Sequence, residues 1–525
     1  MKDNISLVGF MASGKSTVGA LLAKKLKRRF VDMDLELSKR FGMSIVQVFE
    51  SRGERAFREE ESRLLEELGR RERLVIATGG GVPERESNRK LMASTGMTVH
   101  LETDFEACYQ RLTLEERQAR PLWRDKHTLR LLFEHRKNLY SQCAWTVTVD
   151  GKTPEYIVSE IMERLIPEEK ITAVLGYESC PIFVSCRAVS RVAELVQGRR
   201  VAVLTDRNVE QLHLPRFRQA WENACEIVVR AGEGSKNLRT AGRVYEKLLE
   251  QRFERGDLLV AIGGGVVTDL GAFVASTFKR GMGLCLVSTT LLGCVDAAIG
   301  GKAAVNLGRA KNSVGCFTVP NGVILDVESL STLDRRKRTE GLIEAYKTGL
   351  VHSAELAELV ETSFAPLLGG DLPLLAEVVR LSARAKADVV SQDFRESGFR
   401  RILNFGHTYG HAVEGLANFK VSHGQAVAVG MLVATEISRA RGLLPEGLSE
   451  TITATVKALC PIRSPLPSIK EAWEIMTHDK KVRQGRLVFV LLQGRGDPLC
   501  VDDVTPDEVA AAVKRVQDHQ DAASV

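Results

Sequence analysis

The ten cysteines of the 525-residue sequence include no CxxC pair and no regular spacing. A disulfide framework of the kind that holds small secreted domains needs such spacing, so this class is disfavoured. No basic and apolar leader precedes the first expected strand. We therefore expect a protein of the reducing cytoplasm.

Long apolar runs and blocks of like charge are also lacking. The longest apolar stretch, Gly283 to Ile299, is interrupted by Ser, Thr, Gly and Asp296, so it predicts a buried strand and turn. The net charge of +6 is spread over 57.9 kDa, and the basic run at residues 24–29 closes an expected helix. We expect small-molecule substrates, with no membrane and no nucleic-acid partner.

The length suggests two to four domains, and 44% hydrophobic with 27% charged residues is typical of globular proteins. Residues 1–166 alternate apolar runs with amphipathic segments, which indicates a parallel sheet flanked by helices. Expected strands are Ile5–Val8, Leu74–Ala77, Val99–Leu101 and Thr146–Val149. Residues 166–170 are an expected linker.

From Ile171 the alternation of strands and helices restarts, and after Leu333 the pattern becomes a series of long helices. We therefore expect an α/β protein with three domains: a P-loop domain at 1–166, a second α/β domain at 171–333, and an all-helical domain at 334–525. No internal repeat is apparent.

Residues 9–16 read Gly-Phe-Met-Ala-Ser-Gly-Lys-Ser and fit the P-loop pattern G-x-x-x-x-G-K-[ST], between an expected strand and an expected helix. Such a loop presents backbone N–H groups to phosphates, Lys15 reaches the outer phosphates, and Ser16 can ligate Mg²⁺. Together with Gly14 and Thr17, these residues predict an ATP site.

Further polar residues suggest the phosphate acceptor. Asp32 and Asp34 end an expected strand, where one carboxylate can face the metal and the other a hydroxylated substrate. Two ordinary turn carboxylates are the alternative. Arg58 follows, and Gly79, Gly80 and Gly81 come after a buried strand, where their backbone amides can approach a small ligand.

In this order of motifs, residues 1 to about 165 resemble shikimate kinase. The resemblance implies that Arg58 and Arg136 bind the shikimate carboxylate, with Asp34 on its ring hydroxyls and Asp32 on magnesium. Arg120, in Ala119-Arg120-Pro121-Leu122, corresponds to the arginine of the family's mobile lid, which stabilises transferred phosphate charge. Gluconate or adenylate kinase is the alternative, and the combined motifs argue against it.

The second half has no G-x-G-x-x-G motif. Instead, the expected strand Leu258–Ile262 leads into Gly263-Gly264-Gly265 and then Asp269, a glycine turn suited to a pyrophosphate. Asp206, at the end of another expected strand, is a candidate ribose or adenine contact or an ordinary turn residue.

Three of the ten histidines fall in one stretch. His407 and His411 share one face of an expected helix, and His423 begins another helix that could fold back beside them. A catalytic metal of the zinc type wants about three protein ligands, usually imidazole and carboxylate. Spacing alone proposes the three histidines, with Glu344 as one carboxylate candidate among many.

From Ile171 to about Gly496 the order of motifs resembles 3-dehydroquinate synthase. The resemblance assigns zinc (or cobalt) to Glu344, His407 and His423, and makes His411 a substrate-side group. It also implies NAD⁺ and a homodimer formed through this half. The implied NAD⁺ contacts are Asp206, Glu233, Lys236, Gly264, Gly265, Asp269, Thr289, Thr290, Asp296, Lys302, Lys311 and Asn312.

The family cyclises 3-deoxy-D-arabino-heptulosonate 7-phosphate by transient oxidation with NAD⁺, loss of phosphate, return of the hydride and aldol closure. The implied substrate-binding and catalytic residues are Arg280, Lys302, Asn312, Lys347, Arg400, Asn404, His411 and Lys480. Departures from the family are Gln425 for a usual Glu, Ala303-Ala304 for a usual Thr-Gly, and Gly234-Ser235 in a usually more basic motif.

Three other functions stay open at this point. A polyol dehydrogenase shares the α/β plus helical layout, and a sibling sugar-phosphate cyclase shares the ligands. In the third, one half has lost its catalytic activity and serves as a regulatory module. Loss of Lys15, Asp34, Glu344 or His407 would support this function, but all four are present. The resemblance of both halves to enzymes of one aromatic pathway favours a bifunctional enzyme.

Overall fold

The computed structural model describes residues 3–113, 125–143, 145–308, 310–417, 421–461, 466–478, 482–483 and 486–521. The chain divides into two compact units, Met1–Leu165 and Ile166–Val525. Each unit has its own sheet and its own buried core. Among the described residues, no helix combines the length and the apolar character that crossing a bilayer requires.

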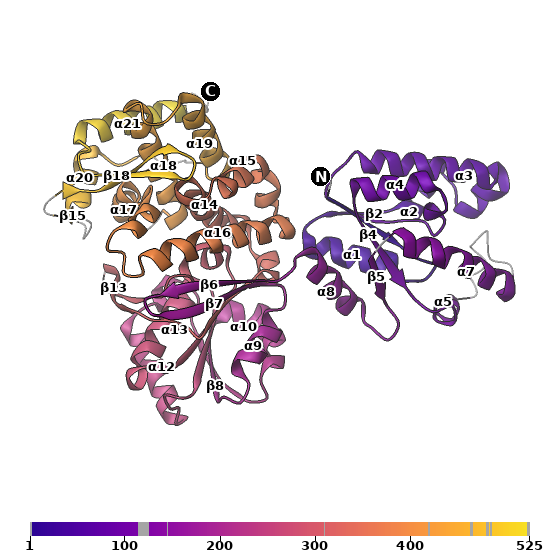
Figure 1. Ribbon diagram of the computed structural model, residues 1–525, viewed down its shortest axis with the longest axis horizontal. Helices are drawn as coiled ribbons and strands as arrows, with labels where there is room; N and C mark the ends of the chain where they lie inside the picture. Colours follow the sequence, from indigo (N-terminus) through magenta and orange to yellow (C-terminus); the bar gives the residue numbers. More distant parts are fainter. Residues whose placement is uncertain are drawn as a thin grey trace. The chain divides into compact units, whose positions relative to one another are not determined.

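Unit 1 is built on a five-stranded parallel sheet in the order β2-β3-β1-β4-β5, with helices packed around it (Figure 1). Its strands are β1 (Asn4–Val8), β2 (Arg29–Asp32), β3 (Leu74–Ala77), β4 (Gly96–Glu102) and β5 (Trp145–Thr148). Its longer helices are α1 (Lys15–Leu26), α2 (Met33–Phe41), α3 (Ile45–Gly69), α4 (Glu86–Thr95), α5 (Phe105–Arg111), α7 (Lys126–Cys143) and α8 (Pro154–Leu165).

The order of these strands determines where a ligand can bind. From the central strand β1 the chain crosses to β2 at one edge, whereas β4 lies on the other side of β1. A crevice opens beyond the carboxyl ends of the strands where the order reverses in this way. The loop after β1 lies at that point, and the residues after β2 and β3 border it.

Unit 2 begins with a seven-stranded sheet in the order β6-β7-β14-β11-β10-β8-β9, parallel except for β6. The strands are β6 (Glu169–Leu175), β7 (Glu178–Ser185), β8 (Val201–Asp206), β9 (Ala224–Val229), β10 (Leu258–Gly263), β11 (Gly283–Ser288) and β14 (Gly322–Asp326). Helices in this part include α9 (Ala188–Val196), α10 (Arg207–Leu212), α12 (Leu238–Glu250) and α13 (Gly265–Thr277). The expected linker ends inside the sheet, because β6 starts at Glu169.

A helical region follows the sheet. Its helices are α14 (Arg335–His352), α15 (Ala354–Gly369), α16 (Leu372–Gln392), α17 (His407–Leu416), α18 (His423–Ala440), α19 (Glu446–Leu459), α20 (Ile469–His478) and α21 (Pro506–Asp521). The expected fold class is confirmed, with one difference. The antiparallel strands β17 (Phe489–Gly494) and β18 (Asp497–Val501) lie within the region expected to contain helices alone.

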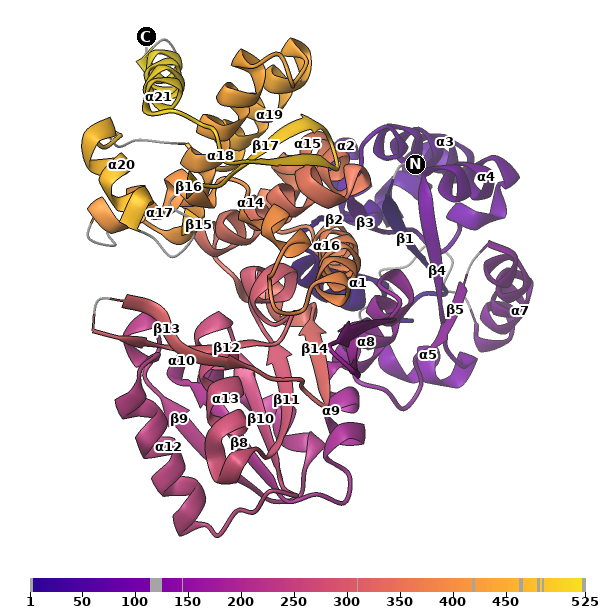
Figure 2. The ribbon, with the colours of Figure 1, turned by 60° about the vertical axis from the view of Figure 1, so that its left-hand side comes forward.

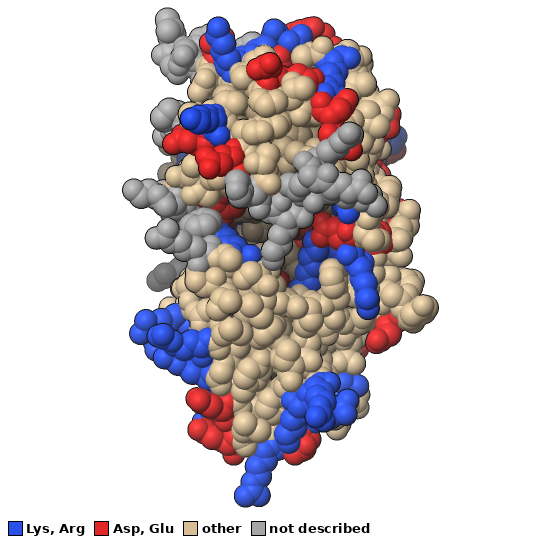
Figure 3. Space-filling view, turned by 90° about the vertical axis from the view of Figure 1, so that its left-hand side faces the viewer, with Lys and Arg blue, Asp and Glu red and all other residues tan. Residues whose placement is uncertain are grey.

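A second hairpin, β12 (Lys302–Leu307) with β13 (Ala310–Phe317), extends from the sheet toward the helical region (Figure 2). In the space-filling view, this face of unit 2 is hollowed at mid-height, and charged side chains of both signs gather around the hollow (Figure 3). Figure 2 places the β12–β13 hairpin where the sheet and the helical region meet.

Candidate active sites

The loop between β1 and α1 has the form of a phosphate cradle. The Nζ of Lys15 donates to the backbone carbonyls of Gly9 and Phe10, each at 2.8 Å. Gly14 precedes the helix, which has no acidic residue in its first turn and no side chain capping it. Ser16 and Thr17 are exposed at the start of α1. The first-turn N–H groups thus favour an anion.

Asp32 connects this loop to the next helix. One carboxylate oxygen accepts from Ser16 Oγ at 2.5 Å, and the other accepts from the backbone N–H groups of Asp34 and Leu35 as the N-cap of α2. β2 ends at Asp32, so Asp34 lies in the first turn of α2 rather than in an expected strand. A hydroxyl and a carboxylate side by side are ligands that suit Mg²⁺.

The turn at Gly79–Gly81 gathers the side chains expected to bind shikimate. A Cβ atom at Gly79 would lie 2.9 Å from Asp34 Oδ1, and one at Gly81 would lie 2.2 Å from Arg58 Nη1. At Gly80 the distance to Arg136 Nη1 would be 3.5 Å. Side chains larger than hydrogen would fill this space, so glycine keeps both the backbone and the charged groups accessible to a ligand.

Glu61, which sequence analysis missed, lies at the centre of this group. Its Oε2 accepts from Arg58 Nη1 at 2.9 Å, while its buried Oε1 lies beside Gly79 and has no hydrogen-bond partner within the described part of the chain. Burial raises the pKa of Glu61, opposed by Arg58 and reinforced by Asp34. The spacing of three residues from Arg58 on one helix was the only signal in the sequence.

We predict that Glu61→Gln raises the KM for shikimate about tenfold or more. Glu61 holds the Arg58 guanidinium in place, and a hydrogen bond to a charged group contributes about 1.5–3 kcal/mol. The KM for ATP should stay within about twofold, because Lys15 bonds to the carbonyls of Gly9 and Phe10 and Ser16 bonds to Asp32. Steady-state kinetics with each substrate varied in turn test this, and an equal rise in both KM values would contradict it.

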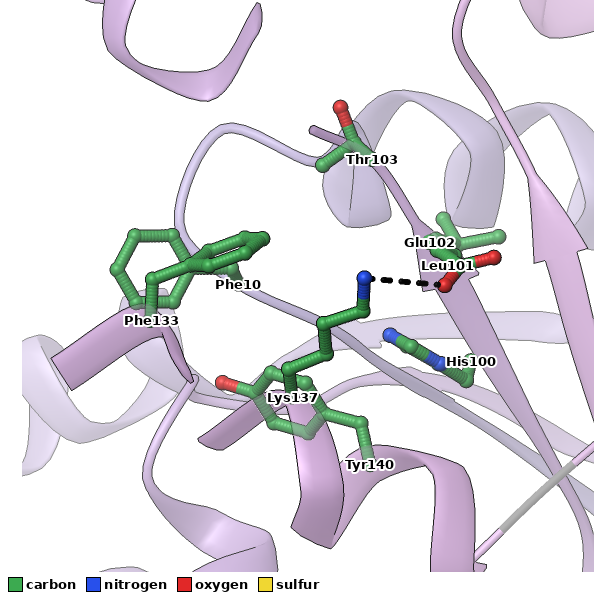
Figure 4. A pocket seen from close by; sticks show the side chains of 8 residues that line it. All are labelled: Phe10, His100, Leu101, Glu102, Thr103, Phe133, Lys137 and Tyr140. Carbon is green, nitrogen blue, oxygen red and sulfur yellow. Dashed lines mark ion pairs between the residues drawn. The ribbon is translucent and has the colours of Figure 1, made fainter. Parts of the chain in front are cut away.

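A small cavity of about 10 Å³ lies behind the phosphate loop, lined by Phe10, His100, Phe133, Lys137 and Tyr140 among others (Figure 4). Phe10 packs edge-on against Phe133 at 5.1 Å between ring centres. Burial lowers the pKa of His100 to about 4, so its ring is neutral. This volume is large enough for about one water molecule and too small for a substrate.

In unit 2, the glycine turn joins β10 to α13. Gly264 caps the helix without a side-chain hydrogen bond, and a Cβ atom there would lie 2.9 Å from Thr290. Thr289 donates its backbone N–H to the carbonyl of Gly263 at 2.9 Å. The turns after β10 and β11 therefore lie side by side, and open N–H groups at the start of α13 fit a pyrophosphate.

Other expected dinucleotide contacts border this turn. Lys236 pairs with Asp269 of α13, and Glu233 accepts from Asn306 of β12 at 2.7 Å. Asp206 caps α10 through the N–H groups of Asn208 and Val209, at 2.9 and 3.1 Å. Asp206 therefore acts as an ordinary turn residue, which was the alternative to a ribose or adenine contact. Both bonds use Oδ1, and Oδ2 takes part in neither of them.

Glu344, His407 and His423 form the one group of metal-ligating type found among the described residues. Their ligand atoms all lie within 4.8 Å of one another. Glu344 Oε1 is 3.7 Å from His407 Nε2 and 3.3 Å from His423 Nε2. This oxygen is buried and accepts no hydrogen bond from the residues that the structure describes, so the three groups converge on a point that suits a cation.

Both histidines turn their Nε2 atoms toward Glu344 because their Nδ1 atoms face other oxygens. His407 Nδ1 donates to the carbonyl of Phe405 at 3.2 Å, and His423 Nδ1 lies 3.5 Å from Glu414 Oε2. Burial lowers the pKa of His423, but Glu344 and Glu414 outweigh it and raise the pKa to about 10. Burial would raise the pKa of Glu344, yet Lys347 and both histidines hold it well below its usual range.

Cations surround the ligand group. Lys347 Nζ donates to Glu344 Oε2 at 2.5 Å, and both side chains are almost fully buried. Asp296, in a turn of π-helix after β11, accepts from the buried Lys386 of α16. Burial lowers the pKa of Lys386 to about 8. Sequence analysis missed Lys386, since a lysine within a long helix carries no signal of its burial.

A third cluster lies at the base of the β12–β13 hairpin. Glu396 accepts from Lys302 Nζ at 2.5 Å and from Asn404 Nδ2 at 3.0 Å. Arg400 is 2% exposed, donates to the carbonyls of Gly300 and Phe394, and leaves its buried Nε unpaired. Sequence analysis missed Glu396, whose backbone has a left-handed φ of 58°.

Of the remaining expected residues, some lie near the ligand group or on the hairpin and two lie outside the described residues. The His411 ring lies 5.4 Å from that of His407 but outside the ligand group. Lys311 pairs with Glu414, and the neighbouring Asn312 donates its N–H to Asn306. Burial would raise the pKa of Glu414, but His423 and Lys311 lower it to about 2. Arg120 and Lys480 lie outside the described residues.

Arg280 is not brought to the site within this chain. It precedes β11, whereas Thr289 follows that strand, and six strand residues span about 20 Å. The ligand group and the glycine turn lie at the carboxyl ends, so Arg280 is at the opposite end of the sheet.

Gln425, one departure from the family, has a local role. It forms a capping box with Ser422 at the start of α18: Gln425 Oε1 accepts from the Ser422 N–H at 3.1 Å, and Ser422 Oγ accepts from the Gln425 N–H at 3.4 Å. Glutamate and glutamine both serve at this position of a capping box. The helix that begins with His423 is therefore formed normally.

Comparison with known proteins covers both units. A shikimate kinase model matches residues 11–166, and models of the N-terminal and C-terminal domains of 3-dehydroquinate synthase match residues 226–340 and 341–482. The bifunctional shikimate kinase/3-dehydroquinate synthase of Thermotoga maritima is 35% identical over 508 residues, which cover 96% of this chain and 99% of that protein. The chain belongs to the bifunctional shikimate kinase/3-dehydroquinate synthase family.

As a member of this family, the protein phosphorylates shikimate in unit 1 and converts the heptulosonate phosphate to 3-dehydroquinate in unit 2. The synthase half is also similar to sibling cyclases. A 2-epi-valiolone synthase of Actinosynnema mirum is 39% identical over 341 residues, 63% of this chain and 89% of that protein. The alternatives of a fused dehydrogenase or sibling cyclase are not supported, because the Thermotoga relative spans both halves.

A solved structure resembles the synthase half. It is ValA, a 2-epi-5-epi-valiolone synthase of Streptomyces hygroscopicus with NAD⁺ and Zn²⁺ bound. The TM-score is 0.62 at 28% identity, over 66% of this chain and 98% of that chain. The sheet and helical region of unit 2 thus share the fold of a dinucleotide- and zinc-binding cyclase.

Proposed function

We propose that Glu344, His407 and His423 bind the catalytic Zn²⁺ (or Co²⁺) of the synthase half. The observation that carries this proposal is the buried Glu344 oxygen without a hydrogen-bond partner, faced by two imidazole Nε2 atoms. One carboxylate and two imidazoles leave positions open for a substrate hydroxyl. His411 lies beside the ligands as a substrate-side group.

In this proposal the glycine turn at Gly264–Gly265 holds the NAD⁺ pyrophosphate, with Thr289 and Thr290 alongside and Glu233, Lys236, Asp269 and Asp206 at its border. When bound, NAD⁺ accepts and returns a hydride, and the metal acidifies a hydroxyl and polarises a carbonyl. Lys302, Lys347, Asn404 and Arg400 then bind the carboxylate and phosphate of the substrate. Lys347 and Lys302 are held for this task by Glu344 and Glu396.

In the kinase half, Lys15 and the loop amides bind the phosphates of ATP, while Ser16 and Asp32 hold Mg²⁺. Arg58 and Arg136 bind the shikimate carboxylate, each oriented by its own glutamate, Glu61 or Glu84. Asp34 orients or deprotonates the attacking hydroxyl. Their common position around the Gly79–Gly81 turn supports this assignment.

We also propose a cytoplasmic homodimer assembled through the synthase half. Arg280 can act on substrate only if a second copy presents it, because it lies at the far end of the sheet in its own chain. Sedimentation velocity of the full chain and of residues 166–525 tests the assembly. A monomer in both samples would remove both the dimer and the substrate role of Arg280.

A chelator is the test of the metal site. Treatment with a strong zinc chelator, followed by gel filtration, should abolish phosphate release from the heptulosonate phosphate, and added Zn²⁺ should restore it. Shikimate phosphorylation with fresh Mg²⁺ should be unaffected, since the proposed Mg²⁺ ligands lie in unit 1. The untreated synthase reaction should give no net NADH. Full synthase activity in metal-free protein would reject the proposal.

A further inference from the structure

Glu414, on α17, lies between two groups that come from different parts of unit 2. One of its oxygens accepts from Lys311 Nζ on strand β13, and the other lies 3.5 Å from His423 Nδ1 at the start of α18. Its side chain is 9% exposed. Each carboxylate oxygen is therefore engaged by one partner, away from solvent.

The contact with His423 determines which nitrogen faces the metal site. A carboxylate facing Nδ1 accepts the hydrogen bond of that nitrogen and so turns Nε2 toward the metal site, at 3.3 Å from Glu344 Oε1. His407 is oriented differently, by the neutral carbonyl of Phe405. Glu414 thus fixes the orientation of the His423 ring. As a carboxylate, it also makes the imidazole a stronger electron donor to a metal than a neutral carbonyl would.

The contact with Lys311 connects this arrangement to the β12–β13 hairpin. The hairpin carries Lys311 and Asn312 near its tip and Lys302 at its base, all of them expected cofactor or substrate contacts. Lys311 also compensates the negative charge of Glu414, whose side chain is largely buried. Burying a carboxylate without a cationic partner would cost free energy of folding. The lysine therefore holds Glu414 where His423 needs it.

We propose that Glu414 is a positioning residue that orients His423 toward the metal and joins the metal site to the β12–β13 hairpin through Lys311. The inference rests on the proposed metal site of Glu344, His407 and His423. It concerns a residue outside that ligand group.

The test is the zinc dissociation constant of the full chain, measured without NAD⁺ by competition with a chromophoric chelator. Glu414→Ala should weaken zinc binding about 10–100-fold, the usual cost of losing a partner of a ligating histidine. Glu414→Gln keeps the volume and one acceptor oxygen, so its constant should fall between wild type and Glu414→Ala. Lys311→Met should weaken binding less than Glu414→Ala.

Glu361 of α15 offers a matched control. Its side chain is 8% exposed and is likewise engaged from two sides, by Arg495 and Tyr346, and it is not a member of the ligand group. Glu361→Ala should leave the zinc constant within about twofold. The double variant Lys311→Met/Glu414→Ala should bind zinc as Glu414→Ala does, because Lys311 acts through Glu414.

The outcomes separate this inference from the metal site itself. If Glu414→Ala and Glu361→Ala bind zinc equally well, Glu414 does not position His423. A further loss on adding Lys311→Met to Glu414→Ala would show that the lysine acts independently, which overturns the link to the hairpin. If His423→Ala binds zinc like wild type, the proposed ligand set is wrong.

Discussion

Replacing His407 by alanine should abolish synthase activity while shikimate phosphorylation continues at the wild-type rate. With the proposed ligand set, the variant would keep only Glu344 and His423, so the metal should be lost at ordinary zinc concentrations. A metal acting as a Lewis acid contributes several kcal/mol to the transition state, which corresponds to about 10³-fold or more in kcat. Phosphate release from the heptulosonate phosphate, ADP formation with shikimate, and zinc content measure the three effects.

His352 provides the control for this prediction. It lies at the end of α14, the helix that carries Glu344, and its Nε2 pairs with Asp388 at 2.6 Å outside the ligand group. His352→Ala should keep zinc content and synthase kcat within about twofold of wild type. His407→Ala protein that retains a full equivalent of zinc and normal turnover would contradict the proposed ligand set.

Asp34→Asn should reduce the kinase kcat by about 10²–10⁴-fold, the range expected for loss of a general base. Asparagine keeps the shape of the side chain beside Gly79 but cannot accept the proton of the attacking hydroxyl. The KM for ATP should hardly change, because Lys15 and the loop amides are untouched. Synthase turnover in the same preparation reports whether the chain has folded.

Asp3→Asn is the matched control for this change. Asp3 is an exposed aspartate of the same unit that lies before the start of β1 and pairs with Arg28 at 3.4 Å. Its kinase kcat should equal that of wild type. A normal kcat in Asp34→Asn with only a raised KM for shikimate would limit Asp34 to substrate binding.

The sequence predicted best those features that depend on neighbouring residues. The phosphate loop needs Lys15 at one spacing from its glycines, and a strand before it and a helix after it, all of which are local patterns. The strands Ile5–Val8, Leu74–Ala77 and Leu258–Ile262 were expected near their observed positions because their side chains are largely apolar. Local chemistry was thus readable without the fold.

Contacts between distant segments were not readable in this way. Spacing proposed His411 as a ligand because it shares a helical face with His407, whereas Glu344 comes from α14 and reaches the same point only after folding. Resemblance to a family supplied Glu344 where spacing could not. Glu61 and Lys386 were missed because nothing in their local sequence marks burial, and Glu396 was missed because its position depends on a left-handed backbone.

The capping box at the start of α18 has a consequence for how this enzyme can vary. His423 is the first residue of that helix, so the position of its imidazole depends on Ser422 and Gln425. An exchange between glutamine and glutamate preserves both bonds of the box. The capping role therefore permits either residue at position 425, while the side chain of Ser422 has to keep its hydroxyl to bond the helix backbone.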